Sequence, residues 1–314
     1  MRRRLVVTAC GLLLPCAVVA ADEASSTRPM RIVVPFAAGG NADLIARWLA
    51  LRLEPAMARP VIVENRAGAG GNLALDFVAR SAPDGSTWLL GTSTLATNPV
   101  FVKMPADPMV DLVPVIGLAQ HAMVVFARKD LPAQGPLELL ALLRASAAPL
   151  SCGATGGGTR LGCELLRQQS GGSLVVVEYR GSSQVMSDLA AGHVDLAVDI
   201  GHAGRALVGA GKIKTLARAG APGGDGSQLP DVLPGFDIQG WTGLFAPTGT
   251  PAARLERMRD ALQRVLTEPA TRERWHEMGA KVPADPSAAG LAQRLRWDTE
   301  RYRDIARAAG MPAP

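Results

Sequence analysis

The stretch "RIVVPFAAGGNADLIARWLA" (residues 31–50) joins three features in order. A β-branched apolar run comes first, a loop with two adjacent glycines follows, and apolar residues then recur at helical spacing. The plan repeats in "PVIVENRAGAGGNLALDFVAR" (residues 60–80). Strands alternating with helices predict an α/β fold with a largely parallel sheet. Each glycine loop then meets a helix amino end, where unpaired N–H groups attract anions.

Residues 1–21 are typical of a secretion signal. "MRRR" is followed by the short apolar run "LVVTACGLLLPCAVVA", and cleavage is expected near Ala20 or Ala21. The apolar run is short for a membrane span, and the polar stretch "DEASS" follows it. We therefore expect a periplasmic, exported protein. "VTAC" also fits a lipoprotein cleavage pattern, which leaves lipidation at Cys10 as an alternative.

Composition excludes several classes of partner. The 314 residues carry a formal charge of +5, but three arginines of the leader account for most of the excess. Aromatic residues make up only 4%, and no basic face with interleaved aromatics is visible, so no nucleic-acid partner is expected. The four histidines are scattered and CxxC is absent, so neither a metal nor a cofactor is expected. Cys152 and Cys163 remain after cleavage, either as a disulfide or as two isolated buried thiols.

The enzyme motifs that use glycine loops do not fit. "GAGGN" (residues 68–72) has the wrong spacing for a dinucleotide fingerprint, and the next acidic candidate, Asp84, precedes its strand. No loop ends in the Gly-Lys-Ser/Thr of a phosphate-binding loop. "GTSTL" (residues 91–95) lacks the second glycine of a nucleophile elbow. Taken singly, each loop also fits a tight turn. As a set facing one cleft, the loops predict a carboxylate site built from backbone N–H groups and hydroxyls.

Several motifs together resemble one family. They are "PFAAGGNAD" (35–43), "VIVENRAGAGGN" (61–72), "APDGSTWLLGTS" (82–93), "VEYRGSSQVMSDLAAGHVDLAVDI" (177–200) and "GWTGLFAPTGTP" (240–251). In these motifs the chain is similar to the Bug-type periplasmic solute-binding receptors of the tripartite tricarboxylate transporters. The resemblance covers nearly the whole chain after the leader.

The resemblance implies a two-lobe periplasmic binding protein of the Venus-flytrap, type II-like fold, each lobe a mixed sheet flanked by helices. Lobe 1 would comprise residues 28–123 plus 240–314, and lobe 2 residues 124–239. It implies a monomer, without catalysis, that captures a small carboxylate between the lobes for membrane transporter subunits or a sensor kinase. A di- or tricarboxylate, an acidic amino acid and an aromatic carboxylate all remain open as the solute.

The resemblance also implies a set of ligand-binding residues. They are Phe36, Gly39, Gly40, Asn41 and Asp43 in the first loop, Thr92 and Ser93 in the third-strand loop, Thr155, Gly158 and Thr159 in the second lobe, and Asp199 at a strand end. Arg160 either pairs with a second ligand carboxylate or points outward from its helix. Asp199 and Asp43 have structural alternatives, as a helix cap and as a favourable first-turn charge. Asn41 and Ile200 depart from the family pattern.

A secreted hydrolase of a small ester or amide is the alternative function. It requires a serine, a histidine and an aspartate in hydrogen-bonding sequence. His193 and His202 are its candidate bases.

Overall fold

The structure is a computed structural model that describes residues 28–219, 232–233, 236 and 238–308. The predicted cleavage near Ala20 or Ala21 and the alternative of lipidation at Cys10 lie outside the described residues. None of the helices in the described part combines the length and the apolar character that a membrane crossing requires.

The first half of the molecule is built on the strand–loop–helix units predicted at residues 31–50 and 60–80. Strands β1 (Met30–Val34), β2 (Val61–Asn65) and β3 (Thr87–Thr92) are parallel, with β1 between the other two. The surrounding helical elements are α1 (Asn41–Met57), η1 (Ala69–Gly71), α2 (Asn72–Ala79), α9 (Ala252–Thr267) and α10 (Pro269–Glu277). The predicted alternation of strands and helices is therefore present here.

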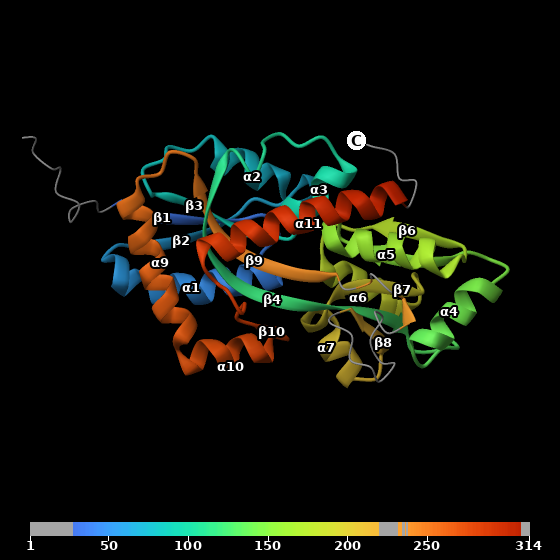
Figure 1. Cartoon of the computed structure of the whole chain (residues 1–314). Helices are drawn as coiled ribbons and strands as arrows, with labels where there is room; N and C mark the ends of the chain where they lie inside the picture. The colour runs from blue at the N-terminus through green and yellow to red at the C-terminus, as the bar shows by residue number, and fades with distance from the viewer. Residues whose placement is uncertain (1–27, 220–231, 234–235, 237, 309–314) are drawn as a thin grey trace, which may run out of the picture.

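The second half repeats the architecture with different strands. Strands β5 (Leu150–Ala154), β6 (Leu174–Glu178) and β7 (Leu196–Ile200) are parallel, and β8 (Ile213–Ala219) pairs antiparallel with β4. The helices are α4 (Pro136–Ala145), α5 (Gly157–Ser170), α6 (Ser182–Ala191) and α7 (Gly201–Gly209). Figure 1 shows these elements grouped at the opposite end of the molecule from β1, β2 and α1.

Two long strands run between the halves (Figure 1). Strand β4 (Leu112–Arg128) pairs with β9 (Gln239–Pro247) up to Ala122, and with β7 and β8 from Met123 onward. In the sequence, a clear strand pattern begins only at Ala122. Pro114 and Gly117 weaken the strand pattern of the earlier part, and the register shifts next to both residues.

Two further helices complete the fold, and the shorter one was not expected from the sequence. Helix α11 (Ala288–Ala308) packs along β4 and against α3 (Thr94–Phe101), and the short strand β10 (Ala280–Lys281) pairs with β4. Helix α3 contains Pro99 and residues of weak helix propensity, which hid it in the sequence. Its position is fixed by tertiary contacts, because Asn98 donates to the Gly70 carbonyl oxygen at 3.0 Å.

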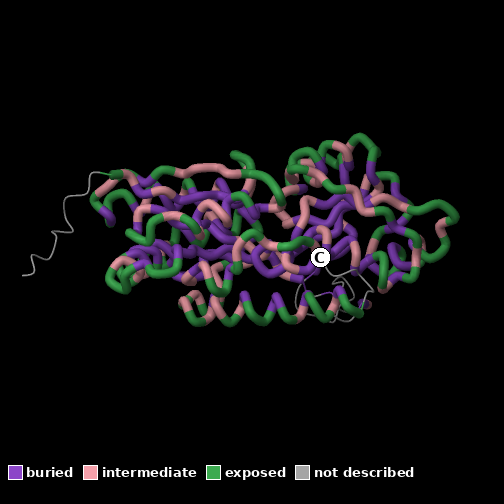
Figure 2. Tube along the Cα trace, turned by 90° about the horizontal axis from the view of Figure 1, so that it is seen from above, coloured by how far each residue is buried: buried purple, intermediate pink, exposed green. Residues whose placement is uncertain are grey.

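Buried residues follow the interior of the elongated molecule, and exposed stretches lie along its outline (Figure 2). The largest buried side chains include Trp88 and Trp275, whose indole N–H groups donate to the carbonyl oxygens of Gly85 (3.0 Å) and Leu118 (2.7 Å). Burial of these aromatics therefore leaves neither indole donor unpaired.

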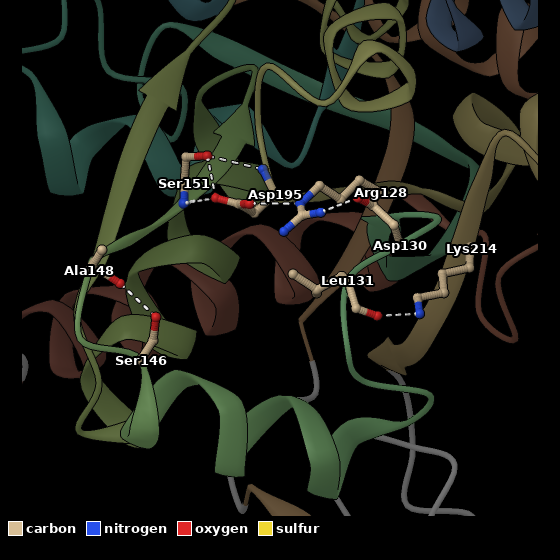
Figure 3. A network of polar contacts seen from close by, with 8 residues as sticks. All are labelled: Arg128, Asp130, Leu131, Ser146, Ala148, Ser151, Asp195 and Lys214. Atoms are coloured by element: carbon tan, nitrogen blue, oxygen red, sulfur yellow. Dashed lines mark hydrogen bonds and ion pairs between the residues drawn. The ribbon is translucent and has the colours of Figure 1, made fainter.

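Covalent and polar links hold the second half together. Cys152 of β5 and Cys163 of α5 form a disulfide, which settles the two alternatives left by the sequence. Figure 3 shows Arg128 at the end of β4 paired with Asp195 (2.9 Å), whose carboxylate also accepts from the backbone N–H and hydroxyl of Ser151 (2.8 and 2.9 Å). These contacts join β4, β5 and the turn before β7.

Candidate functional site

Five helices begin at one cavity of about 170 Å³ that lies between the two halves. The N-cap residues of α1, α3, α5, α6 and α7 all line it: Gly40, Ser93, Gly156, Gly181 and Ile200. None of these five N-cap side chains bonds a helix N–H. The first-turn N–H groups and the positive ends of the helix dipoles therefore face a shared space, which suits an anionic ligand.

Close packing brings helix starts from the two halves together. Gly157, in the first turn of α5, has a φ of +51°, and a Cβ there would lie 2.7 Å from Cγ2 of Thr94 in α3. Only glycine combines this positive φ with so close an approach. Helices α3 and α5 therefore begin side by side at the cavity.

Most of the residues expected from the sequence do lie at the cavity. They are Phe36, Gly40, Asn41, Thr92, Ser93, Thr155, Gly158, Thr159 and Asp199. They come from loops of both halves, so the fold brings together segments that are far apart in the sequence.

Asp43 and Gly39 lie outside the cavity lining and brace the first loop instead. The Asp43 carboxylate is buried and accepts from the Gly39 N–H (2.9 Å), Arg47 Nε (2.8 Å) and Asn65 Nδ2 (3.0 Å). Burial alone would raise the pKa of Asp43, but the Arg47, Gly39 and Asn65 hydrogen bonds outweigh it and hold the pKa below 3.8. Asp43 thus braces the first loop from outside the cavity lining.

Arg160 differs from the expected pairing with a ligand. Its Nη1 atom lies 2.7 Å from Glu178 Oε1, and its guanidinium lies 4.5 Å from the centre of the Phe101 ring. Arg160 is not among the residues that line the cavity. The structure thus places Arg160 outside the cavity lining, where Glu178 and Phe101 hold its side chain.

Arg180, rather than Arg160, is the arginine that lines the cavity. It lies in the "RGSS" loop before α6, lines the cavity and is exposed. Its guanidinium forms no ion pair with any residue in the described ranges. An unpaired guanidinium at a cluster of helix amino ends can bind a carboxylate through two parallel hydrogen bonds. The loop lies within the motif of residues 177–200, but Arg180 was not among the expected ligand-binding residues.

Asp199, at the end of β7, is a buried acid that faces the cavity. Its side chain is 3% exposed, Oδ1 accepts the Ile200 N–H at 2.7 Å, and Oδ2 has no hydrogen-bond partner among the described residues. Burial raises the pKa of Asp199 to about 6, although the Ser182 hydroxyl and the Ile200 N–H oppose that rise.

His121 was missed because it lies in the part of β4 that the sequence pattern obscured. The ring is 4% exposed and lines the cavity, with Nε2 at 3.3 Å from both Asn41 Nδ2 and Thr242 Oγ1. Burial, together with the positive charge of nearby His202, lowers the pKa of His121 to about 4. The ring is therefore neutral at neutral pH.

The geometry that the hydrolase alternative requires is not found in the described part of the chain. His193 pairs with Asp188 (3.6 Å), but its side chain is 71% exposed, and neither His193 nor His202 lines the cavity. Within the described ranges no serine hydroxyl is hydrogen-bonded to a histidine ring, and no group of three His, Cys, Asp or Glu residues is placed to hold a metal ion.

A wider hollow of about 1040 Å³ lies on the outer surface near Arg31, Arg66 and Phe77. The guanidinium groups of Arg31 and Arg66 lie over the Phe77 ring and pair with Glu64. These two guanidinium groups are therefore engaged within the protein, and none of the five helix N-caps described above lines this hollow.

Comparison with known proteins identifies the family. Residues 45–311 match the family described as "Tripartite tricarboxylate transporter family receptor". The chain belongs to this family. The resemblance seen in the motifs is thus confirmed.

The alignments with individual members of the receptor family cover most of both chains. Protein BugT of Bordetella pertussis is 29% identical over 318 residues, covering 95% of this chain and 96% of BugT. The structure titled "R. palustris Rpa4515 with adipate" is 30% identical with a TM-score of 0.84, covering 90% of this chain and 98% of that one. MatC from Rhodopseudomonas palustris with bound malate is 30% identical with a TM-score of 0.81, covering 88% and 98%. The predicted periplasmic binding protein fold is confirmed.

In this tricarboxylate-transporter receptor, Trp241 connects the cavity with α11. It lines the cavity from β9, and its indole N–H donates to Asp298 Oδ2 at 2.7 Å. Arg294 Nε also donates to this oxygen at 2.8 Å. The Trp241 ring is therefore a buried, anchored aromatic at the strand that runs between the halves.

Proposed function

We propose that this receptor captures a small carboxylated solute in the cavity between its two halves and presents it to membrane transporter subunits or a sensor kinase in the periplasm. One observation carries the proposal: five helices begin at the cavity without side-chain caps, and the guanidinium of Arg180, which has no ion pair with a described residue, belongs to the same lining. A carboxylate satisfies these donors and neutralises the positive end of each dipole.

The family and the size of the cavity support this assignment. Structures of two relatives are titled with the carboxylates adipate and malate. The cavity of about 170 Å³ is below the roughly 300–1,000 Å³ of sites for drug-sized ligands, which favours a small metabolite.

We further propose that binding closes two lobes, residues 28–123 with 240–314 and residues 124–239. Strands β4 and β9 connect the halves, and β4 exchanges its β9 partner for β7 and β8 between Ala122 and Met123. This arrangement supports a hinge at the crossing strands, and a ligand that contacts both halves would stabilise the closed form. The closed form would be the state that a partner recognises.

A ligand screen tests the proposal. The exported form is titrated with di- and tricarboxylates, acidic amino acids and aromatic carboxylates, and with the matching amides and esters as controls. A carboxylate at 100 times its Kd should add about 2.7 kcal/mol to the free energy of unfolding and raise the Tm by several degrees. Stabilisation by the uncharged controls alone, or turnover of the esters by the protein, would contradict the proposal.

A further inference from the structure

We propose that Asn41 and His121 together read an uncharged polar substituent of the solute, a hydroxyl or a carboxamide, and so select carboxylates that carry such a group. This inference rests on the proposed function, because it assigns a second recognition element to the same cavity. It concerns residues at the base of the first loop and in β4, away from the helix starts of the second half.

The pair leaves two buried polar atoms unused. Asn41 Nδ2 and His121 Nε2 lie 3.3 Å apart and bond to one another. The remaining atoms, Asn41 Oδ1 and His121 Nδ1, are buried and have no hydrogen-bond partner among the described residues. Both residues line the cavity. Unpaired buried polar atoms are rare in native proteins because each one costs free energy, so two of them at a ligand cavity point to a ligand.

The hydrogen bond between the two residues determines which donor and acceptor atoms of the pair remain available to a ligand. If the amide of Asn41 donates to Nε2, the neutral ring carries its proton on Nδ1, which leaves Nδ1–H as a donor and Oδ1 as an acceptor. If the amide is turned over, Nε2–H donates to its oxygen, and the pair then offers an amide N–H donor and Nδ1 as an acceptor. Either arrangement presents at least one donor and one acceptor.

This combination discriminates between chemical groups. A hydroxyl or a carboxamide both donates and accepts, so it satisfies the pair fully. A carboxylate only accepts and an ammonium only donates, so either would leave one buried atom unpaired. A methylene group would leave both unpaired. Burial keeps the ring neutral, since the pKa of His121 is about 4, and the donor–acceptor character therefore persists at neutral pH.

The charged groups of the cavity lie on other elements. Arg180 precedes α6 and Asp199 ends β7, whereas His121 is in the β4 segment that pairs with β9 and Asn41 begins α1. The carboxylate and the uncharged substituent are therefore recognised by different parts of the cavity. A substitution in one part should leave recognition by the other part unchanged.

Isothermal titration calorimetry on matched solutes tests the inference. The probes are pairs that differ by one group: succinate and malate, and the hydroxylated and hydroxyl-free forms of longer dicarboxylates and of aromatic carboxylates. We expect the wild-type protein to bind the hydroxylated member of its preferred pair about tenfold more tightly, the effect of one satisfied buried polar pair. In His121→Phe, which keeps a ring but no ring nitrogen, this ratio should fall toward one while the hydroxyl-free member binds nearly unchanged.

Three further variants make the outcome decisive. His121→Asn restores a polar group near the position of Nδ1 and should recover part of the preference. Asn41→Ala removes the other half of the pair from a loop position and should also abolish the preference, even if His121→Phe folds poorly. His276→Ala removes an exposed histidine in α10 and should behave as wild type.

The results separate two failures. If the wild-type protein binds carboxylates without preferring the hydroxylated member of any pair, or if His121→Phe and Asn41→Ala keep the preference, the inference is overturned and the proposed function stands. If the wild-type protein binds no carboxylate of the panel, the proposed function fails and the inference falls with it.

Discussion

Under the proposed function, Asp199 would couple its own protonation to the binding of the solute. Its pKa is raised above the ordinary value to about 6, because the buried carboxylate is poorly solvated. Below that pH the carboxyl is protonated and can donate to a ligand carboxylate, and above it the ionised form repels the ligand. The pKa of His121, at about 4, keeps that ring neutral across the same interval.

We therefore predict that the affinity for a carboxylate without an amine rises about tenfold as the pH falls from about 7.5 to about 5.5. Asp199→Asn should remove most of this dependence, because the amide cannot ionise. Calorimetric titrations at several pH values measure it. An affinity that falls with decreasing pH would instead indicate a ligand ammonium paired with ionised Asp199.

Arg180 gives a second prediction at this scale. Arg180→Gln should weaken carboxylate binding about tenfold to a hundredfold, because a charge-assisted hydrogen bond is lost, while the Tm of the ligand-free protein stays within a few degrees. Arg167→Gln is the control, since Arg167 lies in α5, pairs with Glu164 (2.8 Å) and does not line the cavity. Equal loss of affinity in both variants would show a general charge effect rather than a specific contact.

At the scale of elements, the β5–α5 unit combines a loop that lines the cavity with a disulfide bond. The disulfide between Cys152 and Cys163 spans 11 positions of sequence and encloses the loop that carries Thr155 and Gly158. The bond limits how far the start of α5 can move from the end of β5.

We predict that Cys152→Ala/Cys163→Ala lowers the free energy of unfolding by about 2–3 kcal/mol, the closure entropy of a loop of this length. Urea denaturation of the oxidised wild type and of the double variant measures the difference. Adding a reductant should shift the wild-type curve and leave the variant curve in place. Coincident curves for oxidised wild type and variant would contradict the prediction.

At the scale of the whole molecule, two strands carry the connection between the halves, and α11 lies along them (Figure 1). The hydrogen bond between Trp241 and Asp298 ties β9 to α11 at this point. In the closure proposed above, rotation about the crossing strands would leave both halves intact while changing the width of the cavity.

We predict that a saturating carboxylate reduces the radius of gyration, measured by small-angle X-ray scattering, because closure brings the halves together. The Arg180→Gln variant at the same ligand concentration should show a smaller change, in proportion to its lower occupancy. A scattering curve unaltered by bound ligand in the wild type would contradict closure.

Much of the architecture could be predicted because it depends on short-range patterns. The strand–glycine–helix order around residues 31–50 follows from apolar periodicity and from the conformational freedom of glycine, both of which act within a few residues. For the same reason the sequence predicted which loops lie at helix starts. It missed α3 and the first part of β4, where proline and glycine mask elements that long-range packing stabilises.

By itself the sequence determined the α/β class, the family and the glycine loops that supply helix amino ends, since these depend on local hydrogen bonding and on recognisable motifs. The tertiary structure alone decided which side chains face the solute cavity. Arg160 and Arg180 are alike in chemistry, but Glu178 and Phe101 hold the first outside the cavity lining, whereas the second lines the cavity. His121 meets Asn41 across 80 positions of sequence, and only the folded chain brings them together.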